Sequence, residues 1–122
     1  MSKLFLLAGS VFCMLSVALG AFAAHGLKHH VSDYAVGIFK TAAQYQMTHG
    51  LALIAVALLI KWGMQLKWAG FAFIVGILLF SGSLYLLALT GAKWLGPITP
   101  IGGVCFIIGW LILIVKAAKQ PL

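Results

Sequence analysis

The stretch LFLLAGSVFCMLSVALGAFAA, Leu4–Ala24, carries no charged side chain and follows directly after Lys3. It is 21 residues long, and a helix needs roughly 20 apolar residues to cross the hydrocarbon core of a bilayer. Three further uncharged runs follow, each bounded by lysine on at least one side: Thr41–Ile60, Trp68–Ala92 and Pro100–Val115. The sequence therefore contains four candidate membrane spans.

These spans are expected to be helices. Inside lipid, backbone N–H and C=O groups find no water, so only helices and closed barrels cross a membrane. Barrel strands alternate polar and apolar residues, and these runs do not. The sequence therefore predicts an all-α integral membrane four-helix bundle, a single transmembrane domain over residues 1–122. Its helices are expected at about residues 3–25, 36–61, 67–91 and 99–117.

The composition fits this class, because 64% of the residues are hydrophobic and only 7% are charged. The net charge of +7 comes from eight lysines against a single acid, Asp33. The lysines stand singly or in pairs at the ends of the apolar runs, so they are expected to contact anionic headgroups. We therefore expect membrane lipids as partners and no nucleic acid. One carboxylate also leaves no acid–base pair for catalysis.

The lysines predict the orientation of the chain in the membrane. With four spans, both termini lie on one side, and cytoplasmic loops carry the excess of lysine. The side that holds the termini has five lysines, which are Lys3, Lys61, Lys67, Lys116 and Lys119. The other side has three, which are Lys28, Lys40 and Lys93. Both termini are therefore expected in the cytoplasm. Trp62, Trp68 and Trp94 fall at the predicted interfaces, whereas Trp110 is expected to pack against lipid or a neighbouring helix.

Small residues at helical spacing predict where the helices pack. In the first span they recur at spacings of four and three and fall within about 80° of one face. The third span repeats small residues every seven positions from Ala69, and the fourth has two glycines seven apart. Because lipid is as apolar as leucine, helices in membranes gain from close backbone approach. The expected packing residues are Gly9, Cys13, Ser16, Gly20, Ala23, Gly76, Ser83, Thr90, Gly102 and Gly109.

Polar residues in the spans predict a pocket. Thr41, Gln44, Tyr45 and Thr48 share a face of roughly 100°, with His49 at its edge and Gln46 pointing away. Polar groups at this depth are expected to face the bundle. The hypothesis is a ligand-binding polar pocket in the outer half of the membrane; the alternative is that the same groups bond one another and hold the helices in register. The other members of this set are His25, Ser81, Tyr85 and Thr99, the last also expected to cap its helix before Pro100.

Two other interpretations of the stretch Ala18–His30 have less support in the sequence. His25, His29 and His30 lie near Asp33, but no cysteine or second acid supports a metal site, so we expect no metal and no cofactor. Ala21 and Ala23 form the A-x-A pattern of a signal-peptide cleavage site, but the preceding apolar run exceeds the roughly 7–15 residues of a signal peptide.

Four blocks of the sequence resemble a known family. ALGAFAAHGL (18–27), TAAQYQMTHGLAL (41–53), LFSGSLYLLALTG (79–91) and ITPIGGVCFIIGW (98–110) are similar to the signature blocks of the YgdD/YwdK family. These are small multi-pass membrane proteins of unknown function. Ala23 departs from the family pattern, which has glycine there. The resemblance implies a four-helix protein of the cell (inner) membrane and supplies no substrate or reaction.

The expected function is a non-enzymatic, structural or accessory role through contacts with lipids, a second copy of the chain or another membrane protein. The alternative is a small oligomeric carrier of a solute or proton, using the polar pocket. An enzyme is the weakest hypothesis, because no nucleophile–base pair is evident.

Overall fold

The computed structural model covers residues 1–122 and contains helices and no strands, so the all-α prediction is confirmed. Four helical segments are long and apolar enough to cross a membrane. The first, second and fourth spans are α1, α2 and α5, the third is α3 and α4 joined by a π-helical turn, and two short 3₁₀ turns lie in the loops. Their bounds are α1 Ser2–His25, α2 Asp33–Lys61, α3 Lys67–Gly76, π-helix Ile77–Ser81, α4 Gly82–Thr90, α5 Ile98–Lys119, and the 3₁₀ turns Leu27–His29 and Lys93–Leu95.

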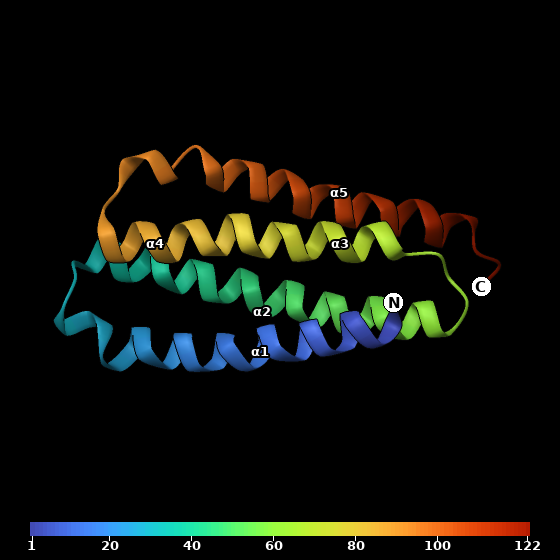
Figure 1. Cartoon of the computed structure of the whole chain (residues 1–122), viewed down its shortest axis with the longest axis horizontal. Helices are drawn as coiled ribbons and strands as arrows, with labels where there is room; N and C mark the ends of the chain where they lie inside the picture. Colours follow the sequence, from blue (N-terminus) through green and yellow to red (C-terminus); the bar gives the residue numbers. More distant parts are fainter.

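The spans form a bundle in which each contacts its neighbour in sequence (Figure 1). α1 packs on α2, α2 packs on the third span, and the third span packs on α5. Both termini lie at the same end. The middle position of α2 gives it buried residues on more than one face, whereas α1 and α5 leave most of their side chains open to lipid.

The starts of α2 and α5 test the predictions about how these helices begin. α2 begins at Asp33, because the Oγ of Ser32 accepts a hydrogen bond from the Ala35 N–H at 3.1 Å. Asp33 then lies in the first turn, where a carboxylate stabilises the free N–H groups. The prediction that Thr99 caps the last helix is wrong. α5 starts at Ile98 without a side-chain cap, and Thr99 lies inside its first turn.

The contact between α1 and α2 depends on glycine. A Cβ on Gly9 would lie 2.6 Å from the Gly50 carbonyl oxygen, and one on Gly50 would lie 2.8 Å from the Cys13 Sγ. No side chain fits at either position without displacing a helix. Ser16 and Ala23 are buried further along α1. Gly20 has open space where its Cβ would be, so it contributes nothing to close packing.

The third span meets α5 in the same way. Gly76 lies against the Phe106 ring, and Gly102 lies against the backbone of Phe80. A Cβ on Gly109 would lie 2.5 Å from the Phe73 ring. The bundle interior at this contact is therefore built from glycines that accept aromatic rings or backbone from the opposite helix.

A π-helical turn at Ile77–Ser81 interrupts the third span. The extra residue in such a turn shifts the helix face that follows it. Ala69, Gly76 and Ser83 are buried, but Thr90 is exposed. The prediction that Thr90 packs between helices is therefore wrong. Its Oγ1 donates to the Leu86 carbonyl at 2.6 Å and accepts from the Ala92 N–H at 3.2 Å, at the end of α4.

Candidate functional site

Most of the predicted polar face of α2 points away from the bundle. Gln44, Tyr45 and Thr48 are exposed, and Thr41 is half-buried. The expectation that the face lines the interior is therefore wrong for Thr41, Gln44 and Thr48, whereas Tyr45, although exposed, packs against the rings of Phe80 and Phe106. Helical periodicity correctly places the four polar residues together, but α1 and the third span occupy the other faces of α2.

Gln46, predicted to point away from the pocket, is the polar centre of the interior. It is 3% exposed. Its Nε2 donates to the Phe12 carbonyl of α1 at 2.9 Å, and its Oε1 accepts from the Tyr85 hydroxyl of α4 at 2.7 Å. One carboxamide therefore joins three spans. The sequence singled out Tyr85 but not its partner.

His49 is buried between α2 and α5 with both ring nitrogens bonded. Nε2 accepts from the indole N–H of Trp110 at 3.0 Å, and Nδ1 lies 2.8 Å from the Tyr45 carbonyl. An indole nitrogen only donates, so Nε2 carries the lone pair and Nδ1 carries the proton. The imidazole also stacks on Phe106, with ring centroids 3.6 Å apart and planes at 9°. A doubly protonated ring would lose the bond from Trp110.

Two serines of the third span make the remaining polar contacts. The Oγ of Ser81 is fully buried and donates to the Ala42 carbonyl of α2 at 2.8 Å. The Oγ of Ser83 donates to Phe80 O at 3.0 Å, so Thr99 is the donor in its 2.6 Å contact with Ser83. No buried side-chain nitrogen or oxygen lacks a partner. The interior polar groups therefore bond side chains or backbone of neighbouring helices, and of the predicted set this holds for His49, Ser81, Tyr85 and Thr99.

His25 does not join this set. It ends α1, is exposed and makes no side-chain hydrogen bond. His49 lies 16 residues beyond the start of α2, which is about 24 Å along the helix axis at 1.5 Å per residue. The two histidines are therefore at different depths, and the predicted pocket linking them is not formed. No three His, Cys, Asp or Glu side chains gather where they could hold a metal.

A groove of about 450 Å³ lies beside His49, between α2 and α5. Tyr45, His49 and Trp110 line it together with Val104 and Ile107, which are 54% and 67% exposed. The groove therefore faces the flank of the bundle, where lipid would lie, and it is not an internal pocket.

The outward face of α2 continues beyond the polar residues. Its residues are spaced by four and three and fall within about 100° of one face. We call this stripe the α2 seam, and all its members are exposed except half-buried Thr41: Gly37, Thr41, Gln44, Thr48, Leu51, Ala55 and Leu58. Gln44 and Thr48 make no hydrogen bond within the chain through their side chains, unlike the interior polar residues. The seam thus combines small residues with unpaired polar ones.

Comparison with known proteins finds a family and close relatives. The family described as "Protein of unknown function (DUF423)" matches residues 19–103. A UPF0382 membrane protein of Staphylococcus aureus (strain bovine RF122 / ET3-1) is 48% identical over 118 residues, which cover 96% of this chain and 97% of the relative. The UPF0382 membrane protein YwdK of Bacillus subtilis (strain 168) is 43% identical over 120 residues, covering 96% and 98%. No solved structure matches the chain.

Proposed function

The chain belongs to the family described as "Protein of unknown function (DUF423)". We propose that it is a non-enzymatic membrane protein that assembles with a second copy of itself through the α2 seam. The observation that carries this proposal is the exposed carboxamide of Gln44. It lies one turn inside the uncharged run that begins after Lys40. A carboxamide without a partner in lipid is unfavourable, and an interface between helices supplies the partner.

Symmetry favours a second copy over an unrelated partner. Two copies in one membrane have the same orientation, so a two-fold axis along the membrane normal brings each residue of α2 opposite its own counterpart. A carboxamide donates and accepts, so Gln44 can pair with Gln44 of the second copy. Thr48, one turn further along, can do the same. The four-and-three spacing fits a left-handed crossing of two parallel helices.

Cross-linking of single cysteines tests this assembly. Cys13→Ser and Cys105→Ala give a cysteine-free chain, into which Gln44→Cys, Thr48→Cys or Leu51→Cys is introduced. We expect rapid disulfide dimers in native membranes, because symmetric pairing places each cysteine near its counterpart. Ile107→Cys is the control, since Ile107 is 67% exposed but lies on α5. Equal cross-linking at positions 44 and 107 would contradict the proposal.

The carrier hypothesis ranks below assembly. A proton carrier that uses His49 would need the ring to exchange protons, and this would break the Trp110 bond. A solute carrier would need the bonded interior polar groups to open. The discriminating measurement is flux in proteoliposomes. Flux that is present in the wild type and lost in His49→Ala, with the variant still folded, would favour the carrier.

We further propose that the chain lies in the cell (inner) membrane with both termini in the cytoplasm. The support is the excess of lysine at the end that holds the termini. Leu122→Cys and Tyr34→Cys in the cysteine-free chain test this orientation, since these positions are 77% and 78% exposed. A membrane-impermeant thiol reagent should label position 34 from the outer side and position 122 only after disruption of the membrane. The reverse pattern would contradict the orientation.

A further inference from the structure

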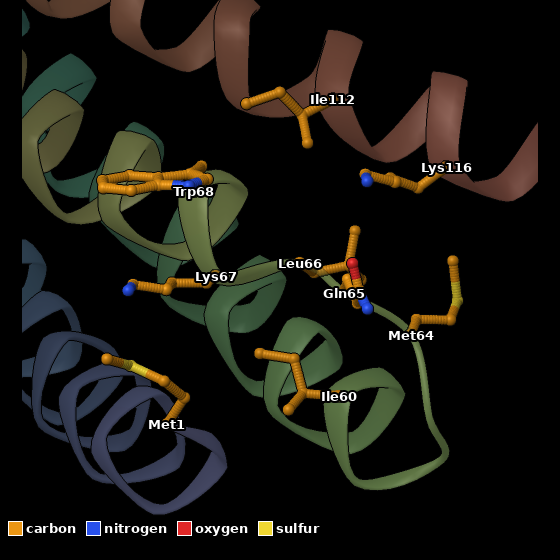
Figure 2. A pocket seen from close by; sticks show the side chains of 9 residues that line it. All are labelled: Met1, Ile60, Met64, Gln65, Leu66, Lys67, Trp68, Ile112 and Lys116. Carbon is orange, nitrogen blue, oxygen red and sulfur yellow. The ribbon is translucent and has the colours of Figure 1, made fainter.

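A hollow of about 510 Å³ lies at the end of the bundle where both termini lie (Figure 2). It is formed where Met1, the end of α2, the following loop, the start of α3 and the end of α5 meet. Apolar side chains line part of it, including Ile60, Leu66 and Ile112. Lys67 and Trp68 line it from α3, and Lys116 reaches toward it from α5.

The two lysines of this hollow have no acidic side chain near them. The only acid of the chain, Asp33, begins α2, and Lys61 ends it. The length of the helix separates Asp33 from this end by about 40 Å. Lys61 and Lys119 add further positive charge here. The ammonium groups of Lys67 and Lys116 therefore have no carboxylate side chain to pair with.

The position of Trp68 indicates how deep the hollow lies in the membrane. Trp68 is 67% exposed at the boundary of an apolar run, as is Trp62, and tryptophan at such positions lies at the level of lipid headgroups. The Nζ of Lys67 lies 5.0 Å from the centre of the Trp68 ring. This cation–π contact keeps the ammonium group beside the hollow.

We propose that the hollow binds an anionic glycerophospholipid, with the phosphate attracted by the ammonium groups of Lys67 and Lys116, which both line the hollow, and with the glycerol and upper acyl chains against Ile60 and Ile112. Lysine binds phosphate as a point charge, and basic pockets between spans hold anionic headgroups. A soluble phosphate would leave the apolar wall unused. The volume is within the range of about 300–1,000 Å³ that is common for ligand pockets. This site is separate from the α2 seam and does not rest on the proposed assembly.

Lipid retention measures this binding. The full-length protein is placed in nanodiscs of phosphatidylglycerol and phosphatidylcholine, and the lipids that remain bound are counted by native mass spectrometry. We expect the wild type to retain phosphatidylglycerol in preference, and Lys67→Gln/Lys116→Gln to lower this preference at least about tenfold. Lys28→Gln/Lys40→Gln is the matched control, because it removes the same charge at the opposite end, from two exposed residues that line no cavity.

The control pair also defines the result that would overturn the site. An equal loss in both variants would show general attraction to the anionic surface, and no loss in either would show that the lysines do not bind the lipid. Displacement of the retained lipid by soluble glycerol phosphate would show an anion site without a lipid requirement.

A second measurement does not depend on how well the lysine variants fold. Brominated phosphatidylglycerol should quench wild-type tryptophan fluorescence more than brominated phosphatidylcholine does. Trp68→Phe should remove this difference, whereas Trp94→Phe, at the opposite end, should retain it. A difference that survives in Trp68→Phe would place the lipid elsewhere.

Discussion

The indole N–H of Trp110 donates a hydrogen bond across 3.0 Å to Nε2 of His49, and this bond joins α5 to α2. The two residues are 61 positions apart in the chain, and the stacking of His49 on Phe106 adds a second side-chain contact between α2 and α5. The bond therefore links the fourth span directly to the centre of the bundle.

We predict that Trp110→Phe weakens this link. The phenyl ring retains aromatic contact but cannot donate, so His49 Nε2 loses its partner. Interhelical hydrogen bonds in membrane proteins contribute about 0.6 kcal/mol on average and up to about 1.7 kcal/mol. A double-mutant cycle with His49→Phe, measured by unfolding in mixed micelles, should give a coupling energy in this range. Trp94→Phe is the control, since Trp94 is 70% exposed. A coupling energy near zero would contradict the prediction.

A second prediction concerns the glycines of α1. Gly9→Ala should destabilise the fold by about 1–3 kcal/mol, because the new methyl group would meet the backbone of Gly50. Gly20→Ala, in the same helix, should be neutral or stabilise the fold by up to about 1 kcal/mol, because its Cβ would point into open space. Unfolding free energies of the two variants provide the comparison. Equal effects would mean that helix propensity, and not the contact with α2, determines the outcome.

The limits of the spans could be predicted from the sequence. Two uncharged runs are bounded by Lys61 and Lys67, and α2 ends at Lys61 while α3 begins at Lys67. The start of α2 differed by three residues, because Ser32 caps the helix in the loop ahead of the apolar run. Hydropathy does not report such a cap.

The orientation of α2 could not be predicted in the same way. The 100° period shows which residues share a face, but not which face is covered. A helix in the middle of the bundle has two covered faces, and on α2 these include Gln46 and His49, while Gln44 remains outside. The sequence predicts that Trp110 packs against lipid or a neighbouring helix, but it does not identify His49 as the partner, because the two residues are 61 positions apart and no local pattern links them. The π-helical turn Ile77–Ser81 contains neither Gly nor Pro, so its sequence gives no sign of an interruption in the helix.

The third prediction compares two glutamines that are two residues apart. Gln46→Leu should destabilise the monomer by about 1–3 kcal/mol, because it removes the bond to the Phe12 carbonyl and leaves the Tyr85 hydroxyl without an acceptor. Gln44→Leu should leave the unfolding free energy of the monomer unchanged and weaken association of two copies. Unfolding in micelles and dimer fraction in bilayers separate the two effects. Loss of monomer stability in Gln44→Leu would contradict the assignment of Gln44 to an outer surface.

The last prediction concerns Ser81, the final residue of the π-helical turn. Its Oγ is 0% exposed and donates to the Ala42 carbonyl of α2. Ser81→Ala should therefore lower the unfolding free energy by about 0.6–1.7 kcal/mol, the range of interhelical hydrogen bonds in membranes. Ser10→Ala is the matched control, because the Oγ of Ser10 is exposed and bonds Leu6 O within its own helix. Ser81→Thr should not restore the wild-type value, since a fully buried site has no space for another methyl group. If Ser81→Ala and Ser10→Ala had the same small effect, the contact between the π-helical turn and α2 would be held by packing alone.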